Sequence, residues 1–197
     1  MEDTTTNEPI CKMRQPVCHH CAVWLGGKIF IFGGTTTGEH EDNTDTIQVF
    51  DPLHDTCVEL EKRLPNCVSQ MAATVYKDNV VILGGIDNEG EVLNTAIKYQ
   101  VVKTNDTLTV YFNRLPDMPT GRYDCTAVTI YDYIIVMGGC IEPAITSGGR
   151  FETKSVEYYN FYDGWTKSKE KFPDMTQARA GATAVRCNIP VESMIHS

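Results

Sequence analysis

A glycine pair that recurs three times at nearly constant spacing is the feature that most constrains the fold of this chain of 197 residues. Each pair closes a short apolar run, in the segments KIFIFGG, NVVILGG and YIIVMGG. The first glycines of successive pairs are 51 and 54 residues apart. A period of this length indicates a repeat architecture in which every unit is one supersecondary element. The glycines are Gly33, Gly34, Gly84, Gly85, Gly138 and Gly139.

Each period contains about four strand-like segments and no helical pattern. The segments HCAVWL, MAATVY and CTAVTI precede the apolar runs across turns of two or three residues, which is a hairpin signal. After each glycine pair a polar loop leads to a third segment (DTIQVFD, LNTAIKYQ, KSVEYYN) and then a fourth (TCVELE, LTVYFNRL, GWTKSK). Four short strands repeating every ~50 residues predict the blades of a β-propeller.

The glycine pairs have a structural explanation. A continuous apolar run is typical of a strand that is covered on both faces, as an inner strand between two blades would be. Where such strands converge and the chain turns away, little room remains for a Cβ atom, and glycine also permits a positive φ. We therefore expect the pairs to serve packing and not catalysis.

The same residues give the chain a resemblance to the kelch-repeat family, from about Pro16 to Val185. The family pattern has an Arg, then a His or small residue three positions later, the glycine pair, a Tyr, and a Trp about seven residues after it. His20, Met71 and Cys125 occupy the position after which the strand begins, and the Arg position holds Val17, Val68 and Arg122. The aromatic position holds Phe50, Tyr99 and Tyr159, and the Trp position holds Cys57 and Trp165, with Phe112 after an insertion in the second unit.

A fourth unit begins with DMTQARAGATAV, where Arg179 takes the Arg position and Ala182 starts the strand. Its glycine pair should fall near Ile195 and His196, but the chain there contains Pro190 and no glycine. Proline would remove a hydrogen-bond donor from the expected strand. The resemblance therefore implies an all-β, incomplete kelch-type β-propeller with three four-stranded blades plus the start of a fourth.

The expected domain limits follow from this repeat. Residues 1–15 form a polar N-terminal segment, 16–185 the partial propeller and 186–197 a tail without kelch pattern. The blades are expected at about 16–65, 66–118 and 119–172, with the fourth beginning at 173. Closed propellers need four to eight blades, so the chain is a fragment, a truncated gene product or a protomer that associates. Open blade ends predict self-association, poor solubility, or further blades in a longer parent chain.

Two thiols and two imidazoles stand together at Cys18, His19, His20 and Cys21, a composition that suggests a metal site. In a β-strand these side chains would alternate between opposite faces, so all four could not bind one ion. A zinc site would also need a second ligand pair at similar spacing, and the next cysteines, Cys57 and Cys67, are ten residues apart. We therefore expect no metal and no other cofactor, and eight cysteines that are mostly buried and reduced.

Charge and composition limit the partners. The chain has 26 acidic and 17 basic residues, a net charge of −9, which would repel nucleic acid and anionic membranes. No apolar run approaches the ~18 residues that cross a bilayer. The acidic, polar start MEDTTTNEPICKMRQ does not resemble a secretory signal, so a cytoplasmic location is expected. A nucleophile elbow, a phosphate-binding loop and a zinc-protease motif are all absent from the sequence.

Three polar loops follow the glycine pairs, at Thr35–Thr46, Ile86–Asn94 and Cys140–Lys154. Because they leave corresponding ends of three inner strands, we expect them to gather on one rim, where a rigid scaffold would hold them for binding. Their mostly negative charge favours a basic or amphipathic protein segment as the ligand. The candidate partner-binding residues are Glu39, His40, Glu41, Asp42, Asp87, Asn88, Glu89 and Arg150.

The sequence thus predicts a non-enzymatic protein-interaction scaffold, and the resemblance to kelch proteins extends this to adaptor or cytoskeletal roles. Two alternatives remain open. Some kelch-like propellers are carbohydrate-active or metal-dependent enzymes, although no ligand set of theirs is reproduced here, and fold alone does not assign activity. The chain could also be a truncated fragment without function.

Overall fold

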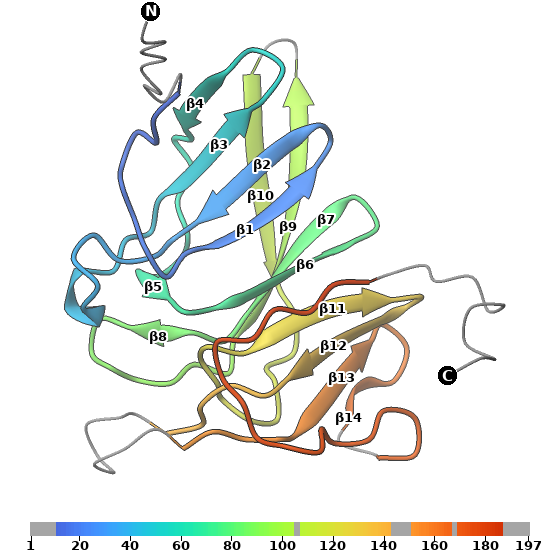
Figure 1. Cartoon of the computed structure of the whole chain (residues 1–197). Helices are drawn as coiled ribbons and strands as arrows, with labels where there is room; N and C mark the ends of the chain where they lie inside the picture. The colour runs from blue at the N-terminus through green and yellow to red at the C-terminus, as the bar shows by residue number, and fades with distance from the viewer. Residues whose placement is uncertain (1–10, 105–106, 143–150, 167–168, 187–197) are drawn as a thin grey trace, which may run out of the picture.

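The computed structural model describes residues 11–104, 107–142, 151–166 and 169–186 (Figure 1). Three antiparallel sheets of four strands and one of two strands form this part of the chain, and its one helical element is the short 3₁₀ turn η1, His40–Asp42. None of the described segments is a helix long and apolar enough to span a bilayer. The strands of the first sheet are β1 (Cys21–Leu25), β2 (Lys28–Phe32), β3 (Ile47–Asp51) and β4 (Thr56–Glu59).

The second and third sheets repeat this plan. The second consists of β6 (Ala72–Tyr76), β7 (Asn79–Leu83), β9 (Ala96–Thr104) and β10 (Thr107–Arg114). The third consists of β11 (Thr126–Ile130), β12 (Tyr133–Met137), β13 (Val156–Asn160) and β14 (Gly164–Thr166). In each sheet neighbouring strands are consecutive members of the repeat and antiparallel, so each sheet is one up-and-down blade. The two-stranded sheet pairs β5 (Val68–Ser69) with β8 (Ile86–Asp87).

The predicted fold is confirmed: three blades are complete and the sheets do not close into a ring (Figure 1). Part of the start of the fourth unit is described, and it follows the third blade without forming a strand up to residue 186. Its amide at Ala184 donates to the Thr126 hydroxyl at the start of β11. The expected positions of Pro190, Ile195 and His196 lie outside the described residues.

Strand register shows which residues are equivalent in the three blades. Phe50 lies opposite Cys57, and Tyr159 lies opposite Trp165. In the second blade Tyr99 lies opposite Phe112, which therefore occupies the Trp position that the insertion obscured in the sequence. The insertion itself is accommodated by lengthening of β9 and β10 into a long hairpin, whose Val101, Leu108 and Val110 pack with the core between the first two blades.

Each glycine pair joins one blade to the next. A Cβ atom on Gly33, Gly84 or Gly138 would lie 2.4, 2.1 or 2.5 Å from the carbonyl oxygen of Val68, Arg122 or Arg179, and all three glycines have positive φ. The second glycine of each pair donates its N–H to that same carbonyl, at 2.9 Å in all three units. The close approach therefore excludes any side chain.

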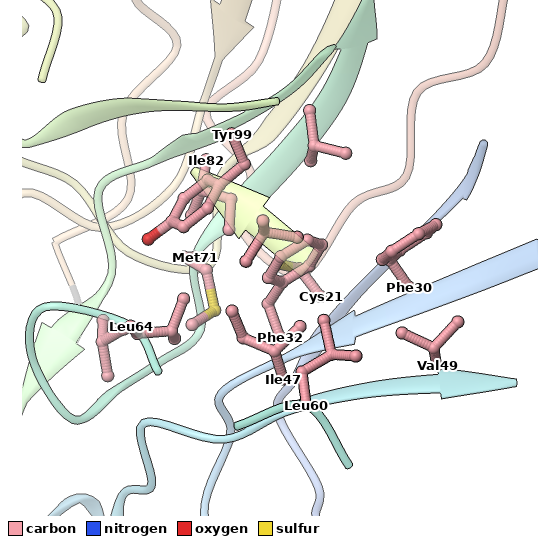
Figure 2. Close-up of a cluster of buried hydrophobic side chains, with 13 residues drawn as sticks. Cys21, Phe30, Phe32, Ile47, Val49, Leu60, Leu64, Met71, Ile82 and Tyr99 are labelled. Carbon is pink, nitrogen blue, oxygen red and sulfur yellow. The ribbon is translucent and has the colours of Figure 1, made fainter. Parts of the chain in front are cut away.

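The main hydrophobic core lies between the first and second blades (Figure 2). Phe30, Phe32, Ile47 and Val49 of the first sheet face the second blade, with Phe32 packed against Tyr99 at a ring-centroid separation of 5.4 Å. A second cluster fills the space between the second and third blades. The blades thus stabilise one another face to face, as the apolar runs predict.

The Cys-His cluster does not have the conformation assumed in the sequence prediction. Only Cys21 lies in β1, and His19 has a φ of +53°, so the chain turns at this point and the strand alternation does not extend back to Cys18. Cys18 instead forms an isolated bridge with Thr35. Cys21 is buried, whereas Cys18, His19 and His20 are exposed. Within the described part of the chain, no three or more His, Cys, Asp or Glu side chains form a group that could hold a metal ion.

Candidate functional site: an acidic rim and an open channel

The loops that follow the glycine pairs start in the same way in every unit. Thr35, Ile86 and Cys140 each pair with the residue that follows the Arg position of their own blade, at Cys18, Ser69 and Tyr123. Each also pairs with a residue on the return of its loop, at Asn43, Val92 and Glu152. The repeated pairing anchors all three loops at one end of the blades, on the side of η1, β5 and β8 (Figure 1).

The first loop folds around Thr35, which is buried and whose hydroxyl donates to the Glu39 carbonyl. The hydroxyl of Thr37 donates to the Asp42 carboxylate at 2.8 Å. These bonds hold η1 on the rim, with Glu39, Glu41 and Asp42 exposed. Three carboxylates within four residues therefore face solvent on a short loop that its own hydrogen bonds order.

The structure brings the first and second loops together. The side-chain amide of buried Asn43 donates to the Ile86 carbonyl at 2.9 Å, and the half-buried ring of His40 lies against Gly90. Since an amide buried without a partner would be destabilising, this bond fixes the two loops relative to each other. The two loops form one continuous surface, which we call the acidic rim, made of residues 35–46 and 86–94.

The side chain of Asp87 fixes the conformation of the second loop. One oxygen of its carboxylate accepts the N–H groups of Glu89 and Glu91, at 3.1 and 2.8 Å. Asp87 thus has a structural role in the turn, which leaves Glu89 as the exposed carboxylate among the three candidate residues of this loop. Asn88 is half-buried, and Arg150 of the third loop lies outside the described residues.

A hollow of about 320 Å³ lies on the acidic rim and is lined by Asn66, Cys67, Asp87, Asn88 and Glu89. Its electrostatic character is visible at the thiol of Cys67. Burial raises the pKa of that thiol, and the negative charges of Asp45 and Glu89 raise the pKa further. Because the carboxylates of Asp87 and Glu89 line it, the hollow disfavours anions and favours cationic groups.

A second feature is a groove of about 470 Å³ along the first strands of the three blades, β1, β6 and β11, which we call the open channel. Four residues that line it, two positions after the Arg position of each unit, all have positive φ: His19, Gln70, Asp124 and Gly181. Each of the last three donates its N–H to the carbonyl of the one before, at 2.8, 2.8 and 2.9 Å. This ladder of backbone bonds runs from blade to blade around the open channel.

Sequence reasoning did not identify this ladder. The four residues share one position in the repeat, but His, Gln, Asp and Gly have no common side-chain chemistry that would draw attention to it. Their equivalence lies in the left-handed backbone conformation, which the residue types do not reveal except at the glycine.

Comparisons with known proteins agree with this geometry. The family model described as Kelch motif matches residues 16–62. The solved structure titled "Structure of YjhT" is similar to this chain with a TM-score of 0.71 at 14% identity, over 88% of this chain and 60% of that chain. At such low identity the likeness shows the fold alone, and this chain spans less than two thirds of that solved chain. Curated protein sequences give no match.

Proposed function

Because the chain carries a kelch motif and folds as an open kelch-type β-propeller, we propose that it is a non-enzymatic protein-interaction scaffold that binds its partner on the acidic rim. The single observation that carries this proposal is the bond between Asn43 and Ile86, which fuses two polar loops into one ordered surface. A preordered surface loses less conformational entropy when a partner binds.

The charge of the rim indicates the kind of partner. Glu39, Glu41, Asp42 and Glu89 are exposed there, and the hollow beside Glu89 has a lining of amide, thiol and carboxylate groups. A basic or amphipathic protein segment in an extended or loop conformation would place lysine or arginine side chains against these carboxylates. Such complementarity contributes mainly to specificity and association rate.

Synthetic peptides test this proposal directly. A panel of labelled basic peptides of differing sequence is titrated with the full chain, and binding is followed by fluorescence anisotropy at low and moderate salt. We expect the double variant Glu41→Gln/Glu89→Gln to weaken binding of the best peptide about tenfold, since each pair of exposed charges contributes roughly 0.2–1 kcal/mol. The affinity should also fall as salt screens the rim.

The matched control is Asp78→Asn/Asp132→Asn, which also removes two negative charges, but from the turns between β6 and β7 and between β11 and β12. Those turns lie at the opposite ends of the strands from the acidic rim. Equal loss of affinity in both double variants would show that only the net charge matters. Failure of every basic peptide to bind would reject the proposed partner chemistry.

The open ends of the propeller support a second part of this proposal, namely that further blades or another copy complete the ring. Val80 and Tyr99 of the second blade are 0% and 1% exposed because they face the first blade. Their register equivalents in the first blade, Ile29 and Phe50, are half-buried, and Trp24 beside them is 59% exposed. An apolar face of this kind favours association.

Light scattering on the isolated chain checks this part. We expect a mass above that of one chain, and a lower mass in the variant Trp24→Glu, which places a charge on the exposed face and removes the part of the association that uses the blade end. A wild-type chain that remains monomeric and melts cooperatively would exclude self-association through the blade ends.

A further inference from the structure

The outer strand of the second blade differs from those of its neighbours. β10 has eight residues, whereas β4 has four and β14 has three. In the order of its sheet β10 is the outermost member, and β9 is the strand to which it is hydrogen-bonded. The insertion in the second blade has therefore produced a long sheet edge on the circumference of the molecule (Figure 1).

The register identifies the backbone groups along this edge. The N–H of Leu115 donates to the Ala96 carbonyl, in the same register that pairs Tyr111 with Gln100. Residues in an antiparallel strand alternate between bonding to the partner strand and facing away from it. The N–H and C=O groups of Leu108, Val110, Phe112 and Arg114 consequently point outward. Among the described residues, none of these groups forms a backbone hydrogen bond with a residue outside its own sheet.

The edge lacks the features that usually prevent strands from pairing. It contains no proline and no glycine, and its one charged residue, Arg114, is at its end and paired with Asp117 at 3.0 Å. Tyr111 and Phe112 are 56% and 41% exposed. A long edge with a single charged residue at its end, rich in β-branched and aromatic residues, is a template for strand addition.

We propose that β10 pairs with β10 of a second copy of this chain, in an antiparallel arrangement with the two-fold axis at Tyr111. This register places the outward-facing groups of both strands opposite each other and allows about eight hydrogen bonds between the copies. Val110 then lies opposite Phe112 of the other copy, and Leu108 opposite Arg114. Aromatic and β-branched residues favour such pairs, and no like charges face each other.

Charge also favours a second copy at this edge. The chain carries a net charge of −9, so two copies repel each other over most of their surfaces. The strands β9 and β10 contain no Asp or Glu, and Asp106 is the one acidic residue between them in the sequence, so these two strands are a region where copies can approach. The strand edge alone is smaller than a standard stable interface, so we expect a dimer that forms at micromolar concentration and strengthens with salt.

A charge exchange at the two-fold axis tests the proposal. Because Tyr111 would lie about 4.5 Å from its own equivalent between Cα atoms, Tyr111→Lys and Tyr111→Glu should each abolish the dimer. An equimolar mixture of the two variants should restore it as a heterodimer. Sedimentation equilibrium of the full chain over a hundredfold concentration range measures the association of the wild type, of each variant alone and of the mixture. One variant is fluorescently labelled so that the heterodimer can be followed.

Tyr162→Lys is the matched control, since Tyr162 is 94% exposed on the turn between β13 and β14 and should leave the dimer intact. Phe112→Pro is an independent test, because it removes an outward N–H without breaking the ladder to β9. A wild-type chain that stays monomeric, or a mixture that stays dissociated, would overturn the proposal. Association that persists in Tyr111→Lys but is lost in Trp24→Glu would assign it to the blade ends. Peptide binding to the acidic rim is measured separately and does not depend on either result.

Discussion

The Arg position of the repeat holds a charged residue in the third blade and an apolar residue in the second. In the third blade Arg122 is fully buried, and its guanidinium donates to the Gly138 carbonyl at 2.9 Å and to Ser155. It also pairs with the buried carboxylate of Glu157 at 3.3 Å. In the second blade the equivalent residue is Val68, which is buried among apolar neighbours.

The counterpart of Glu157 changes together with the Arg position. The strand register makes Ile97 of the second blade equivalent to Glu157 of the third. Ile97 lies opposite Ile82, and Glu157 lies opposite Val136, which is the residue of the third blade equivalent to Ile82. Val68 and Ile97 line a small cavity of about 20 Å³, in the space that a longer side chain at position 68 would fill. An apolar pair in one blade thus replaces an ion pair in the other.

The comparison shows which part of the repeat is indispensable. The carbonyls of Val68 and Arg122 accept the N–H of Gly34 and Gly85 at the same distance of 2.9 Å, whatever side chain they carry. The backbone join between blades therefore does not require the arginine. A buried ion pair can be exchanged for apolar residues, provided that both partners change together.

Breaking the ion pair in the third blade should have the largest effect. Arg122→Val leaves Glu157 buried opposite an apolar side chain, and we expect it to lower the free energy of unfolding by about 3–5 kcal/mol. The double variant Arg122→Val/Glu157→Ile copies the second blade and should recover most of that loss. Urea denaturation of the four proteins of this cycle measures the coupling. A double variant no more stable than Arg122→Val would contradict the exchange argument.

Substituting the glycines at the backbone joins should cause the next largest loss of stability. The loss should be similar at the joins to the second and to the third blade. Gly33→Ala and Gly84→Ala place a Cβ against a carbonyl and keep a positive φ, so each should destabilise by about 2–5 kcal/mol through strain and overlap. Gly26→Ala is the control, because its φ is also positive but no atom lies within 4 Å. It should lose only about 1–2 kcal/mol. Thermal melts that rank Gly26→Ala equal to Gly84→Ala would remove the steric part of the explanation.

Filling the cavity of the second blade should have a smaller effect of opposite sign. Val68→Ile adds one methylene beside a cavity of about 20 Å³, and we expect a gain of about 0.5–1 kcal/mol. Val136→Ile in the third blade is the comparison, since Val136 is fully buried and should lose stability by overpacking. Denaturant midpoints at constant m-value measure both, and a loss in Val68→Ile would show that the cavity cannot accept the added group.

Thiol reactivity should distinguish the blade interfaces without changing stability. Burial raises the pKa of Cys21 and Cys125 to about 12, so near pH 8 both remain protonated and unreactive in the folded protein. Cys18 is exposed and should be alkylated first, with half-buried Cys67 slower. Mass spectrometry of timed alkylation at pH 8 measures these rates. Early modification of Cys125 would mean that the interface between the second and third blades opens.

Much of the fold could be predicted from the sequence, because the information is local and repeated. The alternation of apolar runs, turn residues and glycine pairs recurs in every unit, so the order of strands in each blade and the incomplete ring follow from spacing alone. The acidic loops could also be placed on one rim, since they follow equivalent glycines. The bond from Asn43 to Ile86 that joins two of these loops was not predictable, because it spans 43 residues between different units.

Other predictions were limited by the same lack of long-range information. The Cys-His cluster was treated as part of a strand, but the left-handed conformation of His19 ends the strand pattern before Cys21. A non-glycine residue with this conformation gives no sequence signal. Phe112 was named for the Trp position only after allowing for an insertion, and the strand register places it there, opposite Tyr99.

The sequence by itself determined that this chain forms four-stranded blades, how many are complete and where each inner strand ends, because strand period and glycine placement act within a few residues. The tertiary structure decided how the blades join. It showed that the second glycine of each pair donates its N–H to a carbonyl of the next unit, that Val68 and Ile97 take the places of Arg122 and Glu157, and that β10 is an open edge. These contacts join residues far apart in the chain, and their energies depend on burial, which exists only after folding.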